Sequence, residues 1–353
     1  MAHGVRCVAE MLAALIGAFA TALVGARVYL RVAPRRALDV PNHRSSHSRP
    51  TLRGGGLVIV LGFLVGLGLW IAQQNTLSPR ALGWLAGALL VAAVGFVDDL
   101  RPLPALARLL TQLAGAVLLT VAGVQDRELP LVLALPLAFL FVVSVTNVYN
   151  FMDGIDGLAT VQAIIAGLAL AIGGSIVRNP LLAVGGGLLA AASLGFLVYN
   201  RPPAQLFMGD VGSTFLGFSF AGLSLLGNIG VGGGRLPVEF GLVILAPFLF
   251  DSLVTLARRV VRGERWYTAH RSHYYQRLVQ RGRSHAQVTS LYAGLAILAA
   301  AAALAGLTAD QPLRQTLAVL AYTPMLLVVA LVWRLESSAQ LPKQPKDAPT
   351  VVT

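Results

Sequence analysis

The sequence predicts an all-α, polytopic membrane protein with about eleven transmembrane helices, and ten is the other count that fits. Of its 353 residues, 56% are apolar and 12% are charged, and the mean hydropathy is +0.73. Such a composition is typical of chains that reside in lipid. Because the bilayer core offers the backbone no water, each spanning segment is expected to be a helix.

Apolar stretches near the roughly 20 residues that a helix needs to cross a bilayer follow one another along the chain. The predicted spans are residues 8–30, 54–72, 81–97, 105–123, 129–147, 157–176, 181–198, 212–227, 238–257, 286–307 and 315–334. The third to fifth spans lack decisive charged breaks, which is why ten crossings also fit. Residues 1–336 are interpreted as one multi-pass domain, and residues 337–353 as a disordered cytoplasmic tail.

The distribution of Lys and Arg predicts the orientation. An outside N-terminus and a cytoplasmic C-terminus leave six of the 27 basic residues outside and place the other 21 in the cytoplasm. The positive-inside rule favours this orientation. The net charge of +12 therefore reflects topology and attraction to anionic lipid head groups, and no nucleic acid partner is expected.

Acidic residues gather on the same predicted side. Of the ten aspartates in the chain, five fall in three short loops: Asp98, Asp99, Asp153, Asp156 and Asp210. Carboxylates crowded at a membrane boundary repel one another and lose hydration unless a cation lies between them. A divalent ion bound by oxygens, most simply Mg²⁺, would relieve the repulsion, and ordinary solvated loop acids are the alternative.

The stretch "NVYNFMDGIDGL" (Asn147–Leu158) sets two asparagines beside two of these aspartates. Carboxamides both donate and accept hydrogen bonds, which suits a nucleobase or a sugar. Gly154 and Gly157 would let the backbone approach a ligand. Helix ends and plain Asp-Gly turns are the alternative explanation.

Two basic loops provide partners for phosphate. The first, "DVPNHRSSHSRPTLRGGG", carries Arg44, His47 and Arg53, and the second contains "HRSH" with His270 and His273. A zinc pair is less expected because no cysteine lies near and further ligands are missing. Arginine and histidine donors around a phosphate fit better. Metal-binding acids beside phosphate-binding bases are what phosphoryl transfer needs, and the lipid boundary suggests that one substrate is a lipid.

Five stretches resemble, in order, the signature loops of the polyprenyl-phosphate N-acetylhexosamine-1-phosphate transferases: "DVPNHRSSHSRPTLRGGG", "GFVDDL", "NVYNFMDGIDGLA", "NRPPAQLFMGDVGS" and "HRSHYYQRL". The resemblance implies transfer of an N-acetylhexosamine 1-phosphate from a UDP-sugar to undecaprenyl phosphate, with release of UMP and with Mg²⁺ or Mn²⁺ as cofactor. It also implies a multi-pass protein of the bacterial cytoplasmic (inner) membrane, with its active site on the cytoplasmic face. A homodimer is compatible with it.

The resemblance also implies residue roles where the motifs match. The catalytic candidates are Asp98, Asp99, Asp153 and Asp156. The metal ligands are Asp210, Asp98 and Asp99. The substrate phosphates are expected at His270, Arg271, His273, Arg108, Arg44, His47 and Arg53. The nucleotide is expected at Asn147, Asn150, Asp156, Asn200 and Phe207.

The motifs favour one branch of the family. The peptidoglycan branch carries consecutive histidines where this chain has "HRSH", and its first loop differs. The chain resembles the O-antigen branch more closely, so UDP-MurNAc-pentapeptide is not the expected donor. The sugar stays open among GlcNAc, GalNAc, FucNAc and QuiNAc.

Two other classes compete with this interpretation. A transporter of phosphorylated solutes would carry its charges near the bilayer midplane, whereas these gather at one face. Another lipid phosphotransferase, of the CDP-alcohol type, would need further spaced aspartates after "DGIDGLA", and these are absent. Asp251, within a predicted span, is a functional acid, one half of a structural pair with Arg258, or part of a polar helix end.

Overall fold

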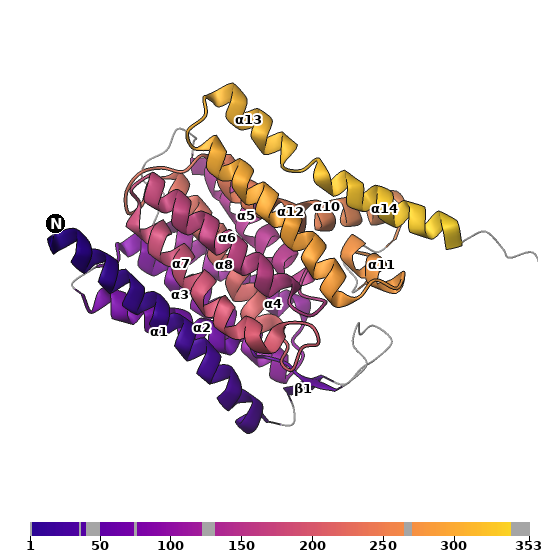
Figure 1. The fold of residues 1–353 in the computed structure, drawn as a ribbon, viewed down its shortest axis with the longest axis horizontal. Coiled ribbons are helices and arrows are strands. Elements are labelled where there is room, and N and C mark those ends of the chain that lie inside the picture. The colour runs from indigo at the N-terminus through magenta and orange to yellow at the C-terminus, as the bar shows by residue number, and fades with distance from the viewer. Residues whose placement is uncertain are drawn as a thin grey trace, which may run out of the picture.

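The structure, a computed structural model, describes residues 2–34, 37–39, 50–73, 76–121, 131–264 and 270–339. The described chain is mainly α-helical, with most helices gathered in one bundle (Figure 1). The helices are α1 (Ala2–Val32), α2 (Leu57–Ile71), α3 (Pro79–Leu100), α4 (Ala105–Val121), α5 (Leu131–Phe151), α6 (Leu158–Ile176), α7 (Pro180–Asn200), α8 (Gly209–Asn228), α9 (Val238–Ile244), α10 (Ala246–Val261), α11 (Tyr274–Gln280), α12 (His285–Gly306), α13 (Gln311–Leu320) and α14 (Pro324–Ala339). Two short strands, β1 (Leu38–Asp39) and β2 (Thr51–Leu52), pair antiparallel.

Helices occur in all eleven predicted spans, the ninth as the pair α9 and α10 and the last as α13 and α14. By length and apolar composition, six helical segments of the described chain could cross a membrane, or seven if α9 and α10 form one bent span. The protein is thus helical and multi-pass. The count of eleven, the orientation, the single domain and the disordered tail stay predictions, and residues 340–353 lie outside the described part.

Two predicted boundaries are corrected. α3 continues to Leu100, so Asp98 and Asp99 lie in its last turn and not in a loop. The predicted span 238–257 is broken, because α9 and α10 meet at an angle of 79°. Pro247 stands in the first turn of α10, where its missing amide hydrogen costs no helical hydrogen bond.

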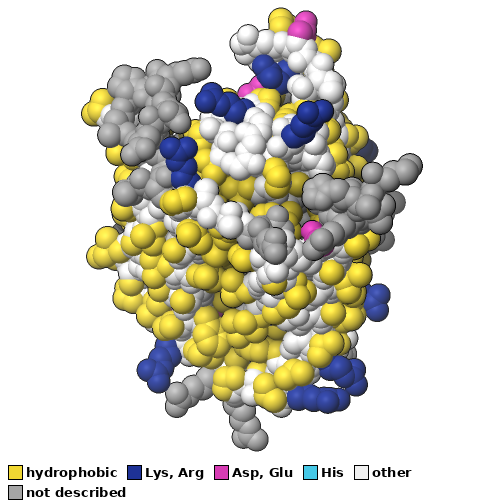
Figure 2. All heavy atoms as spheres, turned by 90° about the vertical axis from the view of Figure 1, so that its left-hand side faces the viewer, with side chains coloured by type: hydrophobic (Ala, Val, Ile, Leu, Met, Phe, Trp, Pro, Cys, Tyr) yellow, Lys and Arg dark blue, Asp and Glu magenta, His cyan; other side chains and the backbone are white. Residues whose placement is uncertain are grey.

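Figure 2 shows a broad band of hydrophobic side chains across one face, with Lys and Arg side chains toward both ends. Large apolar side chains stay exposed elsewhere too, among them Ile16 on α1, Leu140 on α5 and Leu327 on α14. Soluble monomers rarely expose apolar surface on this scale. A band of this kind matches the hydrocarbon core of a bilayer.

Inside the bundle, small residues and aromatic rings build the core. A Cβ at Gly167 of α6 would lie 2.7 Å from the Gly186 carbonyl oxygen of α7, so these two backbones are in contact. Small residues permit such approach between membrane helices. α8 lies against α3 and α5, with Phe215 and Phe218 fully buried. This central helix begins at the acids, so its packing sets where they lie.

The segment before α8 is tied to the strand pair. Leu52 of β2 bridges to Leu206 in parallel, and the Phe207 amide donates to the Leu52 carbonyl oxygen at 2.8 Å. The Gly55 amide donates back to the Phe207 carbonyl at 2.9 Å. The first basic loop is therefore anchored at the N-terminal end of α8.

Candidate active site

Asp99 joins the end of α3 to the start of α8. It is 4% exposed, and its carboxylate accepts hydrogen bonds from the backbone amides of Asp210 (2.9 Å) and Val211 (3.1 Å). Arg53 donates to the same carboxylate through Nε (3.0 Å) and Nη2 (2.8 Å). A carboxylate at a helix N-terminus satisfies unpaired amides and the positive end of the helix dipole. Four donors occupy the acceptor sites of Asp99, which favours a positioning role over the predicted metal ligation.

Asp98, the adjacent residue, has a different environment. Its Oδ1 accepts the Leu103 amide at 2.5 Å. Arg108 of α4 spans both acids, with Nη1 at 3.4 Å from Asp98 Oδ2 and 3.3 Å from Asp210 Oδ2. The guanidinium therefore marks a position between the two carboxyl groups where positive charge is stabilised.

Asn150, at the end of α5, lies in the same group. Its Nδ2 donates to Asp210 Oδ1 at 3.0 Å and to Ser213 Oγ at 2.9 Å. Its side-chain oxygen, Oδ1, makes no hydrogen bond within the described chain, whereas its backbone oxygen accepts the Asp153 amide at 3.2 Å. The structure thus places Asn150 against the acids, whereas sequence reasoning assigned it to the nucleotide.

Asp153 is half-buried just beyond α5. Burial, with the negative charges of Asp210 and Asp99, raises the pKa of Asp153 well above its usual value. The raised pKa means that the protonated, neutral form of Asp153 is favoured. A cation bound nearby would favour the charged form instead.

The approach of α8 to Asp99 requires a glycine. Gly209 has φ +74, and a Cβ there would lie 2.5 Å from Asp99 Oδ2 and 2.7 Å from the Gly54 amide nitrogen. L side chains rarely adopt this conformation, which costs about 1–3 kcal/mol when forced.

Gly209→Ala is therefore expected to lower the melting temperature and to abolish turnover, because the new methyl group pushes Asp99 from the α8 amides. Melting in detergent micelles checks this. Gly294→Ala is the matched control, since a Cβ at that helical position meets nothing within 4 Å. Equal melting temperatures for both variants would contradict the close approach at Gly209.

The second basic loop is held by one buried carboxylate, Asp251 of α10, which is 0% exposed. It accepts the backbone amides of Tyr274 (2.9 Å) and Tyr275 (3.0 Å), and also a hydrogen bond from the Tyr292 hydroxyl. Thr255 Oγ1 lies 3.3 Å from Oδ1. Asp251 thus fixes the start of α11, and the suggested pairing with Arg258 is replaced by this set of donors.

His273 extends this arrangement toward the other loops. Its Nδ1 lies 3.3 Å from Asp251 Oδ1, and the side chain is buried. The Tyr275 hydroxyl donates to the Phe151 carbonyl at 2.9 Å, next to Asp153. The segment His270–His273, called the histidine loop from here on, therefore packs on the loop that carries Asp153 and Asp156.

His270 lies beside His273, with ring centroids 5.0 Å apart. Burial, with the charges of His273 and Arg259, lowers the pKa of His270 to about 4. At neutral pH His270 can donate an N–H to a phosphate but supplies no charge, whereas sequence reasoning expected a cation. The backbone oxygen of Arg271 accepts from Gln280 Nε2 at 2.8 Å, which ties the loop to the end of α11.

The depressed pKa of His270 predicts a pH dependence of stability. In the unfolded chain His270 takes up a proton near pH 6.5, whereas in the folded protein it takes up that proton only near pH 4. Stability is therefore expected to fall as pH drops from about 6.5 to 4 and to level off below. Histidine-selective NMR titration, with H270Q for assignment, checks this, and a titration midpoint near 6.5 would contradict it.

Asp156 connects three segments rather than facing open space. Its Oδ2 accepts the Ala204 amide at 3.1 Å and lies 3.2 Å from His285 Nδ1. Thr289 of α12 donates to the Asp156 carbonyl at 2.9 Å. Sequence reasoning missed His285, whose only signal was its place at the end of the second basic loop.

Two predicted nucleotide contacts have internal partners. Asn147 and Gln112 of α4 exchange hydrogen bonds of 2.6 and 3.4 Å. Asn200, which is 3% exposed, accepts from Thr160 Oγ1 (2.6 Å) and donates to the Leu206 carbonyl (2.9 Å). Both amides thus position helices and loops. Arg44 and His47 lie outside the described residues.

Asp98, Asp210 and Asn150 form a group, here called the acid group, whose oxygen atoms could bind a metal ion. Within the described residues, no three or more His, Cys, Asp or Glu side chains are grouped to hold one. Mg²⁺ is often held by only one or two carboxylates together with substrate phosphates. The acid group provides oxygen ligands of that kind, from the carboxylates of Asp98 and Asp210 and the side-chain oxygen of Asn150. These residues therefore fit an ion that is shared with a diphosphate.

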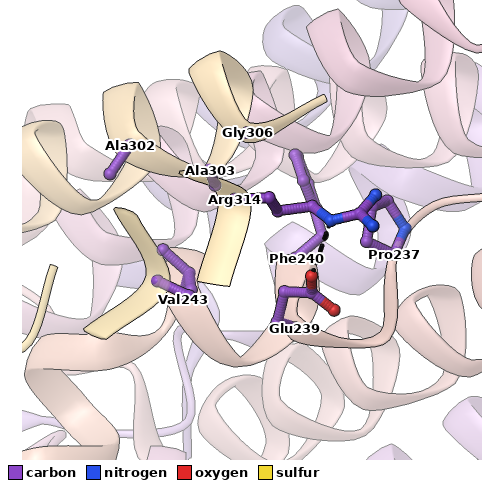
Figure 3. A pocket seen from close by; sticks show the side chains of 9 residues that line it. Pro237, Glu239, Phe240, Val243, Ala302, Ala303, Gly306 and Arg314 are labelled. Atoms are coloured by element: carbon purple, nitrogen blue, oxygen red, sulfur yellow. Dashed lines mark ion pairs between the residues drawn. The ribbon is translucent and has the colours of Figure 1, made fainter. Parts of the chain in front are cut away.

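The pocket in Figure 3 is a separate feature. It lies between α9, α12 and α13 and contains an ion pair of 2.9 Å between Arg314 Nε and Glu239 Oε1. Its other lining residues are Pro237, Phe240, Val243, Ala302, Ala303, Gly306 and Ala318. None of the predicted site residues lines it.

Comparison with known proteins identifies the family of the chain. The model of Glycosyl transferase family 4 matches residues 81–228, a range that includes Asp98, Asp99, Asp153, Asp156 and Asp210. The chain is 31% identical over 291 residues to a probable undecaprenyl-phosphate N-acetylglucosaminyl 1-phosphate transferase of Bacillus subtilis (strain 168), covering 78% of this chain and 79% of that protein. It is also 31% identical over 331 residues to a decaprenyl-phosphate N-acetylglucosaminephosphotransferase of Mycobacterium leprae (strain TN), covering 82% and 81%.

The chain is also similar to proteins named phospho-N-acetylmuramoyl-pentapeptide-transferase, and one of Synechococcus is 33% identical over 276 residues, covering 69% of this chain and 77% of that protein. A phospho-N-acetylmuramoyl-pentapeptide-transferase of Lactiplantibacillus plantarum is 36% identical over 214 residues, which is 52% of this chain and 63% of that protein. The family predicted from the signature loops is confirmed, because the Bacillus subtilis and Mycobacterium leprae relatives are identical to the chain at 31% of positions over most of both lengths. The chain therefore belongs to the polyprenyl-phosphate N-acetylhexosamine-1-phosphate transferases.

Proposed function

We propose that this chain transfers N-acetylglucosamine 1-phosphate from UDP-N-acetylglucosamine to undecaprenyl phosphate or a similar polyprenyl phosphate. A lipid phosphate oxygen attacks the phosphorus that carries the sugar, the bond from that phosphorus to UMP breaks, and a polyprenyl diphosphate sugar forms. The observation that carries this proposal is the pair Asp98 and Asp210 at the ends of apolar helices, with Arg108 in contact with both carboxyl groups. The names of the relatives with the widest coverage support the donor and the acceptor.

The proposed metal site consists of the carboxylates of Asp98 and Asp210 and the side-chain oxygen of Asn150, with Mg²⁺ or Mn²⁺ as the ion. When bound, the ion would neutralise the charge that develops on the donor phosphates. Arg108 can turn from the two acids to the lipid phosphate, because its side chain is 40% exposed. Asp98 is the candidate to orient or deprotonate that phosphate.

The two loops around the acids would receive the sugar nucleotide. Asp153 and the phosphate donors His270 and Arg271 come from loops that pack on each other through Tyr275 and Phe151. Asp99, Asp156 and His273 hold the surrounding segments in place. Phe207, tied to β2 by its backbone, is the candidate neighbour of the uracil.

The acids lie at helix ends, in the last turn of α3 and the first turn of α8, which favours a transferase over a transporter. The proposed location is the bacterial cytoplasmic (inner) membrane with the site on the cytoplasmic face. The proposed role is initiation of an O-antigen-like polysaccharide, and a homodimer is compatible with it.

The deciding experiment measures UMP release by purified protein with undecaprenyl phosphate and Mg²⁺ over a panel of UDP-N-acetylhexosamines. UMP from UDP-N-acetylglucosamine that disappears with chelator is the expected result. Release with another sugar alone would correct the donor. Folded protein that releases no UMP with any donor, or that retains its rate in chelator, would contradict the proposal.

A further inference from the structure

A cluster of arginines lies where α10, α11 and α14 meet, away from the acids. These three helices contact one another, and their labels lie together in Figure 1. The arginine cluster consists of Arg258 and Arg262 from the end of α10 and Arg277 and Arg281 from α11 and its C-cap. The charges of Arg277 and Arg262 act on Arg258 unfavourably, and those of Arg258, Arg277 and Arg281 act on Glu336 of α14 favourably.

The charge of the cluster is not balanced. Glu336 forms an ion pair with Arg277. The Nε of Arg277 donates to Oε1 at 2.8 Å, and its Nη2 donates to Oε2. Arg277 also lies over the Tyr274 ring, 4.9 Å from its centroid. In the described part of the chain, Arg258, Arg262 and Arg281 make no ion pair of their own. One ion pair with three further guanidinium groups around it is complementary to an anion.

Apolar side chains border the cluster on the outside of the bundle. Val260 and Val261 at the end of α10 are 56% and 87% exposed, and Trp333 of α14, one turn before Glu336, is 70% exposed. Tryptophan is enriched where the hydrocarbon core meets the head groups. Cationic and apolar side chains thus lie side by side at the ends of helices, as an anionic amphiphile requires.

We propose that the ends of α10, α11 and α14 bind an anionic glycerophospholipid of the surrounding bilayer. Its phosphate lies against Arg258, Arg262 and Arg281, and its acyl chains lie along Val260, Val261 and Trp333. The inference goes beyond the transfer reaction and does not depend on it. In the described chain, no hydrogen bond or ion pair joins the arginine cluster to Asp98, Asp210 or Asn150, which favours a bilayer lipid over the acceptor substrate.

Such a lipid would act on the site through α11. This helix follows His273 directly, and its Arg277 is clamped to α14. A phosphate that draws α10, α11 and α14 together would steady the histidine loop. Activity should therefore be higher in vesicles of phosphatidylglycerol and phosphatidylcholine mixed equally than in phosphatidylcholine alone.

The test counts phosphatidylglycerol retained by purified protein in neutral detergent, by native mass spectrometry over a titration. Each arginine near an anionic head group contributes about fivefold in affinity, so R258Q/R262Q/R281Q should bind about 100-fold more weakly. R80Q/R178Q/R235Q removes the same charge elsewhere and should bind like the unchanged protein. Because Arg262 and Arg281 are both exposed, R262Q/R281Q guards against misfolding and should lose about 25-fold.

Two results would overturn the proposal. In the first, folded R262Q/R281Q retains phosphatidylglycerol with unchanged affinity. In the second, R262Q/R281Q binds phosphatidylglycerol as the unchanged protein does, but its KM for undecaprenyl phosphate rises. That result would assign the arginine cluster to the acceptor substrate. Neither result bears on whether UMP is released, so failure here is distinct from failure of the proposed transfer.

Discussion

Replacing Asp210 by Asn is expected to lower kcat by about a thousandfold, the loss that follows when one group stabilising transition-state charge is removed. Asp210 contacts Asn150 and shares Arg108 with Asp98, so the change removes one of the two charged ligands of the proposed ion. The fold should survive, because Asn retains the shape and the α8 amides remain bonded to Asp99. UMP release and melting temperature, measured on the same preparation, check both parts.

Two variants frame this result. Asp310→Asn is the matched control, since that aspartate caps α13 and Asn caps equally well. Asp99→Asn should lose activity together with stability, by about 3–5 kcal/mol, because it leaves Arg53 and the α8 amides without their buried carboxylate. A D210N enzyme that turns over within tenfold of the unchanged protein would remove Asp210 from the proposed metal site.

Replacing Asp251 by Ala is expected to release the histidine loop and to destabilise the protein by about 3–5 kcal/mol, as loss of a buried partner does. The backbone amides of Tyr274 and Tyr275 and the ring of His273 would lose their acceptor. Tryptic cleavage after Arg271 should accelerate, and the KM for the sugar nucleotide should rise. Thr255→Val removes one donor of the same group and should cost about 1 kcal/mol.

The discriminating readout is the loop itself. If D251A lowers the melting temperature but leaves cleavage after Arg271 and the KM unchanged, Asp251 stabilises the bundle without positioning the loop. If both change in D251A and neither in T255V, the carboxylate is the support of the histidine loop.

The helical ranges and the acid group could be predicted because both are strong local signals. Apolar runs identify membrane helices directly, and aspartates that recur at one end of those runs identify a shared location. The break between α9 and α10 also had a signal in the sequence, because Pro247 stands in the first turn of α10. The number of crossings is a weaker inference, because short apolar helices such as α2 and α4 lie near the limit of length.

The division of labour among the acids could not be predicted from sequence. Asp98 and Asp99 are neighbours of the same type, and only the helical turn decides that one faces Asp210 and the other caps α8. The pairing of Asp156 with His285 joins residues 129 positions apart. The partners of Asp251 lie on backbone amides of another element, where side-chain chemistry gives no hint.

Asp99 also acts as a spacer between the C-terminal end of α3 and the N-terminal end of α8. Its carboxylate is the only described side chain that bonds the first amides of α8, so its reach, together with the packing of α8 on α3, spaces the two helices at this end. Asp98 and Asp210 lie at the same end of these helices. Asp99→Glu keeps the charge and every donor, yet it lengthens the spacer, so the two helices and the two acids would stand further apart.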